Sequence, residues 1–155
     1  MQSLQKVIEE HPFFKTLDEK YIEVLTGCAA NETFKEGEFI FREGENADKF
    51  YLIREGQVAL EIASPSQRPI SIQTISNGDV LGFSWLFPPY RWCFDALTKS
   101  KVRAISMDGK CLRKKCEDDH ALGYELQKRF GEIMAQRLQA TRIQLMDLYK
   151  TPARG

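Results

Sequence analysis

The stretch Glu36–Ile62, EGEFIFREGENADKFYLIREGQVALEI, decides the fold of this 155-residue chain. Its apolar residues fall in short runs that are separated by glycines. Lys49–Arg54 has the length and composition of one strand, and Val58–Ile62 alternates apolar with polar residues as a half-buried strand does. The separating glycines are Gly37, Gly44 and Gly56. Because glycine adopts positive φ at little cost, these positions predict the tight corners of a structure built from short strands.

The same pattern continues on both sides of this stretch and predicts about eight short strands. They are expected at residues 33–35, 38–41, 49–54, 58–62, 70–75, 79–81, 91–96 and 102–107. Short strands with frequent glycine turns are typical of an all-β sandwich, a jelly roll or a barrel. The pattern alone leaves these three architectures open.

Helices are predicted at both ends of the strand region, so the fold class is mainly β with flanking helices. At this length we expect a single domain over residues 1–155. Its parts are N-terminal helices in 1–30, the β region in 31–107, and C-terminal helices in 108–150. In the first part, apolar residues recur on one side of two short helical segments, and His11-Pro12 separates these segments.

The C-terminal region is expected to hold a short helix capped by Asp108 and a long helix capped by Asp118 or Asp119. The long helix carries a coiled-coil stripe, which predicts dimerisation through this helix. Its members are Met134, Leu138, Thr141, Leu145 and Leu148. Ile143 and Met146 lie off the stripe and would stay exposed on a monomer. A homodimer is therefore the expected assembly.

Charge and cysteine content narrow the class of protein. Lys and Arg together number 22, as do Asp and Glu, and this balance argues against a nucleic-acid partner. No apolar run approaches the roughly 20 residues that span a membrane, and the first residues do not resemble a secretory signal. We therefore expect a cytoplasmic protein without a membrane partner. Its four cysteines, Cys28, Cys93, Cys111 and Cys116, are expected as free thiols.

The stretch Gly78–Thr98 holds a candidate anion site. Gly82 is followed by a possible helical turn with Ser84 as N-cap, and Arg91 comes soon after Pro88-Pro89. Backbone N–H groups at such a turn and a nearby guanidinium attract negative charge. The alternative is a tight turn that fills one end of the barrel, with Arg91 on the surface.

Ile40–Ala47, Phe50–Ile53 and Gly56 together resemble the first signature of cyclic-nucleotide-binding domains. The resemblance implies an eight-stranded jelly roll with N-terminal helices, a hinge helix and a long C-terminal helix. Arg137–Thr141 is similar to the dimer helix of catabolite-activator-type regulators, in which the position of Thr141 touches the base of the ligand. Those regulators continue into a helix-turn-helix domain, whereas the present sequence ends a few residues after this helix. We therefore expect a stand-alone domain without DNA-reading elements.

The second signature of that family, which binds the cyclic phosphate, is altered in this chain. Leu81-Gly82 fits it, but Phe83 stands where the family has a ribose-binding glutamate, and Trp85 replaces a small residue. Counted back from Ala96, the position of the phosphate-binding arginine falls on Tyr90, whereas a count forward from Gly82 with a shortened loop places Arg91 there. The candidate ligand-site residues are Gly82, Phe83, Ser84, Trp85, Tyr90, Arg91, Trp92, Thr141 and Arg142. Cyclic AMP and cyclic GMP are expected to bind weakly or not at all.

Two regulatory functions stay open. One is a ligand-sensing module for a nucleotide-like, planar or anionic small molecule under the C-terminal helix. The other is a ligand-free dimeric adaptor whose pocket is filled by aromatic side chains.

An enzyme of the metal-cupin kind needs histidines on facing strands, whereas His11 and His120 lie in predicted helical regions. We therefore expect no catalytic residue, no metal and no cofactor other than a possible cyclic-nucleotide ligand. Cys93 is expected to be a small strand residue rather than a redox sensor.

Overall fold

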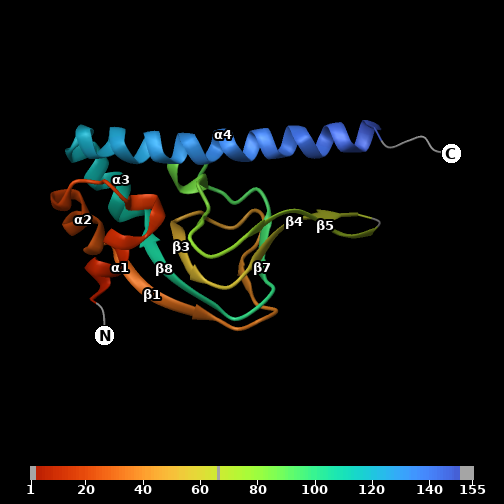
Figure 1. The fold of residues 1–155 in the computed structure, drawn as a ribbon, viewed down its shortest axis with the longest axis horizontal. Helices are drawn as coiled ribbons and strands as arrows, with labels where there is room; N and C mark the ends of the chain where they lie inside the picture. The colour runs from red at the N-terminus through yellow and green to blue at the C-terminus, as the bar shows by residue number, and fades with distance from the viewer. Residues whose placement is uncertain (1–2, 66, 151–155) are drawn as a thin grey trace.

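Two four-stranded antiparallel sheets face each other, and helices lie at both ends of the chain (Figure 1). The structure is a computed structural model and describes residues 3–65 and 67–150. The first sheet has the order β1-β8-β3-β6, and the second has the order β2-β7-β4-β5. The strands are β1 (Ala29–Phe34), β2 (Phe39–Phe41), β3 (Lys49–Glu55), β4 (Val58–Ser64), β5 (Gln67–Ile75), β6 (Val80–Leu81), β7 (Asp95–Thr98) and β8 (Val102–Asp108). The eight-stranded, mainly β fold with flanking helices is thereby confirmed.

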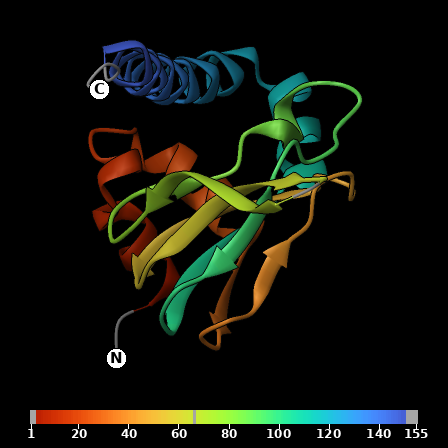
Figure 2. The ribbon, with the colours of Figure 1, turned by 90° about the vertical axis from the view of Figure 1, so that its right-hand side faces the viewer.

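The helices gather against one face of the first sheet, and the longest of them runs across the top of the molecule (Figures 1 and 2). They are α1 (Leu4–Glu10), η1 (Pro12–Phe14), α2 (Glu19–Thr26), η2 (Ser84–Leu86), α3 (Gly109–Asp118) and α4 (His120–Lys150). The Asp108 carboxylate accepts from the Cys111 N–H, as predicted for an N-cap of α3. Asp119 accepts from the N–H groups of Ala121 and Leu122, so of the two candidates Asp119 caps α4.

The strand β3 is buried on both faces and separates two apolar cores. Phe50 and Leu52 point toward the helices, into a cluster that we call the outer core, which also holds Trp85 and Phe130. Tyr51 and Ile53 point between the two sheets, into a cluster that we call the inner core. The other fully or nearly fully buried members of the inner core are Phe41, Ala47, Val58, Leu60, Ile75, Leu81, Trp92, Ala96, Val102 and Ala104. Burial on both faces explains why Phe50–Ile53 is one continuous apolar run.

Several details differ from the sequence-based expectations. β1 begins at Ala29, before the expected start of the β region. The strand expected at 91–96 is shorter, because β7 begins at Asp95 and Arg91 forms only an isolated bridge with Asn46. Cys28 and Cys111 form a disulfide, so the prediction of four free thiols is wrong for this pair.

Among the described helices, none has the length and apolar composition of a membrane-spanning segment.

His11 fastens the corner between α1 and η1 to the barrel. It is only 5% exposed, its Nδ1 accepts from the Phe13 N–H at 3.2 Å, and its Nε2 lies 3.3 Å from the Ile53 carbonyl oxygen. These partners fit a neutral ring with its proton on Nε2. Burial lowers the pKa of His11 below 6.5, the ordinary value. Since protonation on Nδ1 would remove the acceptor for the Phe13 N–H, the folded state favours the neutral form.

We therefore predict that acid weakens the fold through His11. Below about pH 6.5 the unfolded chain protonates this ring while the folded chain resists, so the free energy of unfolding falls by at most about 1.4 kcal/mol per pH unit. Urea denaturation of His11→Gln should lack this part of the slope between about pH 6.5 and pH 5. His120→Gln, which changes the exposed histidine at the start of α4, serves as the control and should keep it. Equal slopes in His11→Gln and the unsubstituted chain would contradict the assignment.

Candidate functional site

Trp92 lies directly against the glycine turn after β6. Gly82 has φ +96°, and a Cβ placed on it would lie 2.6 Å from the Trp92 ring. The indole is 4% exposed and stacks on Phe41, with ring centroids 3.7 Å apart and planes 6° apart. Trp92 therefore fills the part of the inner core that adjoins Gly82. A ligand group can reach this face of the glycine only if the indole moves.

The turn after Gly82 does not provide a helix N-terminus. Ser84–Leu86 forms a single three-residue turn whose N-cap is Phe83, and no side chain caps it. The prediction that Ser84 is an N-cap is therefore wrong, because Ser84 is already the first residue of the turn. Trp85 is fully buried in the outer core, where its ring stacks 5.1 Å from that of Phe50. Trp85 and Trp92 thus belong to different cores.

Tyr90 and Arg91 are directed to partners outside the inner core. The Tyr90 ring lies 4.1 Å from the Arg113 guanidinium of α3. Arg91 is exposed, and its Nη1 donates to the Gly44 carbonyl oxygen at 3.0 Å. The structure thus brings Gly82 and Trp92 together but does not bring the Arg91 guanidinium to them.

The two predicted site residues of α4 are both exposed. The Thr141 hydroxyl donates to the Arg137 carbonyl oxygen at 2.8 Å, one helical turn earlier. Arg142 follows on the exposed part of the helix. Phe83 is partly buried and packs against the outer core, with its ring centroid 5.9 Å from the Arg137 guanidinium. Arg137 therefore lies between the predicted residues of α4 and those of the barrel.

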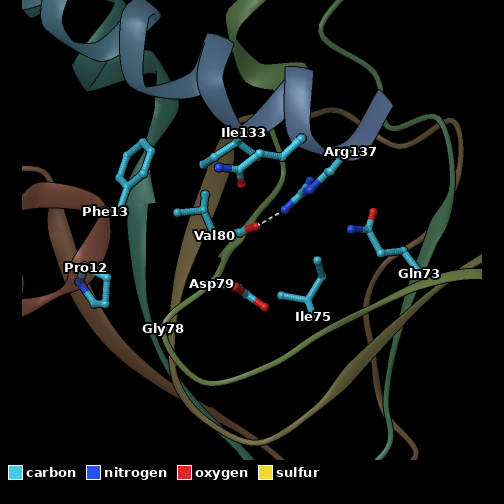
Figure 3. A pocket seen from close by; sticks show the side chains of 10 residues that line it. Pro12, Phe13, Gln73, Ile75, Gly78, Asp79, Val80, Ile133 and Arg137 are labelled. Atoms are coloured by element: carbon cyan, nitrogen blue, oxygen red, sulfur yellow. Dashed lines mark hydrogen bonds between the residues drawn. The ribbon is translucent and has the colours of Figure 1, made fainter. Parts of the chain in front are cut away.

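A cavity of about 350 Å³ lies under α4 at this point (Figure 3). Its lining comes from η1, from the end of β5 and the turn into β6, and from α4. The lining residues are Pro12, Phe13, Gln73, Ile75, Gly78, Asp79, Val80, Ile133, Gln136 and Arg137. Polar and apolar side chains share this wall. None of the nine predicted ligand-site residues is among them.

Arg137 supplies the positive charge of this cavity. Its Nη2 donates to the Val80 carbonyl oxygen, as Figure 3 shows, and no ion pair of this guanidinium occurs among the described residues. Burial lowers the pKa of Arg137, and the charge of Asp79 partly offsets this. The guanidinium still remains protonated, since its pKa lies far above neutrality. A charged group with unused N–H donors therefore faces a cavity large enough for a small molecule.

Sequence analysis missed Arg137 as a site residue, although one signal pointed to it. Arg137 precedes Thr141 by four residues, and side chains at this spacing lie on the same face of a helix. In the described part of the chain, no group of three or more His, Cys, Asp or Glu residues is placed to hold a metal ion.

The two sequence comparisons with known proteins agree with each other. A sequence model described as "Cyclic nucleotide-binding domain" matches residues 31–119. The chain is 28% identical over 152 residues to the CRP-like cAMP-activated global transcriptional regulator of Mycobacterium tuberculosis, covering 98% of this chain and 66% of the relative. It therefore spans slightly less than two thirds of that relative's length.

Solved structures show the same similarity. A solved protein structure from Geobacter metallireducens GS-15 is 27% identical and has a TM-score of 0.78, with 89% of this chain and 99% of that chain covered. A cyclic nucleotide-binding domain from Methylobacillus flagellatus KT also has a TM-score of 0.78, covering 97% of this chain and 84% of that chain. At 14% identity, the second comparison supports the fold alone.

The contact between Gly82 and Trp92 leads to a prediction on stability. Gly82→Ala adds a methyl group that overlaps the indole and also meets an unfavourable φ, so we expect a loss of about 2–4 kcal/mol. Gly44→Ala is the matched control, because Gly44 has φ +89° but nothing within 4 Å of the added Cβ, and it should lose about 1 kcal/mol. In a Trp92→Leu background, Gly82→Ala should cost no more than the control. Urea denaturation of the four variants tests this, and equal losses for both glycines in the native background would contradict it.

Proposed function

Because the chain belongs to the cyclic nucleotide-binding domain family, which is a regulatory family, we propose that it senses a nucleotide-like or other planar anionic small molecule in the cavity under α4. The observation that carries this proposal is the partly buried Arg137 guanidinium, which has no ion-pair partner among the described residues and lines that cavity. A ligand anion would supply the missing charge. The guanidinium offers two parallel donors, which suit a carboxylate or a phosphate.

The rest of the cavity wall suits a planar ligand. Val80 and Ile133 offer apolar contact, and the Phe83 ring lies close to the guanidinium. Gln73 and Gln136 carry side-chain amides, which both donate and accept hydrogen bonds. Such amides can pair with the polar edge of a heterocyclic ring. The ligand would therefore hold its anionic group at Arg137 and its ring against the apolar wall.

Cyclic AMP and cyclic GMP fit this arrangement poorly at the usual place next to Gly82. Phe83 cannot accept a hydrogen bond from the ribose, and loss of a hydrogen bond to a charged group costs roughly 1.5–3 kcal/mol, or about 10- to 100-fold in affinity. The Trp92 indole lies against Gly82, and Arg91 is directed to Gly44. We therefore expect these two nucleotides to bind weakly.

The proposed response passes through α4. This helix contributes Ile133, Gln136 and Arg137 to the cavity, so a bound ligand touches the barrel and the helix at once. A ligand shifts an equilibrium between two helix positions only by its difference in affinity for them. Residues of α4 that contact the ligand are therefore the ones that turn binding into a signal.

The second half of α4 would carry the dimer contact. Leu138, Leu145 and Leu148 of the predicted stripe are 55%, 51% and 75% exposed. Met134, the first residue of the stripe, packs partly against the outer core. We therefore infer that the contact between two copies begins after Met134. Ile143 and Met146, at 53% and 63% exposed, would lie beside it.

The contact between Trp92 and Gly82 favours a second candidate function. If the filled inner core leaves no ligand response, the domain would act as a ligand-free dimeric adaptor. Under that function α4 would present a partner surface in one fixed position. Ligand binding therefore separates the two functions.

A ligand panel and an arginine pair test the sensing function. We predict that one or more planar anions raise the melting temperature of the chain by several degrees, and that Arg137→Ala lowers their affinity at least about 10-fold by calorimetric titration. Arg142→Ala removes an exposed guanidinium from the same helix and should leave the affinity unchanged. No shift with any member of a panel of nucleotides and planar carboxylates would favour the adaptor. Micromolar affinity for cyclic AMP would contradict the expected weak binding.

The dimer contact has its own test. We predict that the unsubstituted chain elutes as a dimer in size-exclusion chromatography with light scattering, and that Leu145→Glu with Leu148→Glu makes it a monomer, because four carboxylates would meet in one apolar contact. Gln139→Glu introduces charge at an exposed position away from the stripe and should leave the dimer intact. A monomeric unsubstituted chain at micromolar concentration would contradict the proposal.

A further inference from the structure

The disulfide joins two parts of the chain that lie far apart in sequence. Cys28 follows α2 and leads into β1, whereas Cys111 lies in the first turn of α3. The two residues are 83 positions apart, and the segment between them contains all eight strands. The bond therefore connects the N-terminal helices directly to α3 at the far end of the barrel sequence.

Other contacts keep these cysteines adjacent whether or not the bond exists. The Asp108 N–H donates to the Cys28 carbonyl oxygen at 2.8 Å, and the Asp108 carboxylate accepts from the Cys111 N–H. Next to them Ala29 pairs with Met107 in the ladder of β1 and β8. The Cα atoms are 6.0 Å apart, a separation common among disulfides. The pair can therefore change its oxidation state without refolding of its surroundings.

The helix α3 in turn contacts the aromatic loop 84–92. Arg113 donates through Nη1 to the Trp85 carbonyl oxygen at 2.5 Å, and its guanidinium lies 4.1 Å from the Tyr90 ring. The Arg113 Nη2 is also 3.5 Å from the Asp48 carboxylate. The helix then leads into α4 after Asp119. A restraint on the first turn of α3 thus acts on both the loop that carries Trp92 and the helix that carries Arg137.

We propose that Cys28 and Cys111 form a redox-regulated pair, which a hydroperoxide oxidises to a disulfide that clamps α3, and which a dithiol reductant releases. This regulation goes beyond the proposed ligand sensing and needs no ligand. Cys111 is partly exposed and Cys28 is 7% exposed, so Cys111 meets the oxidant first.

The chemistry has two steps. The Cys111 thiolate attacks the peroxide O–O bond, forms a sulfenic acid and releases an alcohol, or water when the oxidant is hydrogen peroxide. The Cys28 sulfur then attacks the Cys111 sulfur, so that an S–S bond forms, the S–O bond breaks and water leaves. In total two thiols lose two electrons and two protons to one hydroperoxide. Thiol–disulfide exchange with a dithiol returns both thiols.

The other two cysteines provide matched controls. Cys93 is exposed, and its Sγ lies 3.9 Å from the Arg91 carbonyl oxygen. Cys116 is partly buried on the same helix as Cys111, and burial raises the pKa of its thiol. Neither forms a disulfide in the structure. Removing both should therefore leave the oxidation of Cys28 and Cys111 intact.

The experiment uses the full chain in both redox states. After reduction with dithiothreitol and removal of the reductant, one equivalent of hydrogen peroxide should remove two hydrogens by intact mass, and peptide mapping should find Cys28 joined to Cys111. Cys93→Ser with Cys116→Ser should oxidise in the same way, whereas Cys28→Ser and Cys111→Ser should not form the bond. Folding of the serine variants is checked by circular dichroism, and the two redox states of the unsubstituted chain provide the comparison if either variant fails to fold.

Hydrogen exchange measures the consequence. Oxidation should slow backbone amide exchange in residues 109–118 and 84–92 by several-fold, and dithiothreitol should restore the faster exchange. Three results would overturn the proposal. In the first, no bond forms with peroxide in the folded chain. In the second, exchange in these two segments is the same in both states. In the third, the bond is reduced only after the chain is unfolded by urea, which would make it a purely structural crosslink.

Discussion

Burial of β3 on both of its faces is the constraint on which the rest of the structure depends. Phe50 and Leu52 pack against the helices, and Tyr51 and Ile53 pack against the opposite sheet. Removal of either partner layer would expose one side of this strand to water, which costs about 25 cal/mol for each Å² of apolar surface. The barrel and the helical layer therefore stabilise each other through one strand. The two tryptophans follow this division, since Trp85 completes the outer core and Trp92 the inner core.

Sequence reasoning found the parts of the fold that are set by local chemistry. Glycine corners predicted the strands, and short polar side chains predicted the caps of α3 and α4. It failed where the outcome depends on contacts between distant residues. The pairing of Cys28 with Cys111 follows from β1 lying beside β8, and the outward direction of Arg91 follows from its contact with Gly44. Neither neighbour is visible in the spacing of residues along the chain.

In the proposed site, recognition would depend on other residues within the architecture of the family. The usual polar partner of the ribose is replaced by Phe83, and an indole adjoins the glycine turn. The positive charge near the helix now comes from Arg137, which hydrogen-bonds to the carbonyl oxygen of Val80, two residues before Gly82. The altered phosphate-binding motif does not contain Arg137, so this motif alone could not reveal the change. The cavity became apparent only when α4, η1 and the β5–β6 turn were placed together.

The length of α4 gives this helix the properties of a lever. It is 31 residues long, and Figure 1 shows its second half extending in the same direction as the β4–β5 hairpin. From Arg137 to the end of α4 at Lys150 the helix extends about 20 Å, at 1.5 Å per residue. A tilt of about 10° with its fulcrum at Arg137 would therefore carry the far end through about 3 Å. That displacement approaches the width of a methyl group, so a movement too small to open the barrel is enough to change which side chains meet at the distal tip.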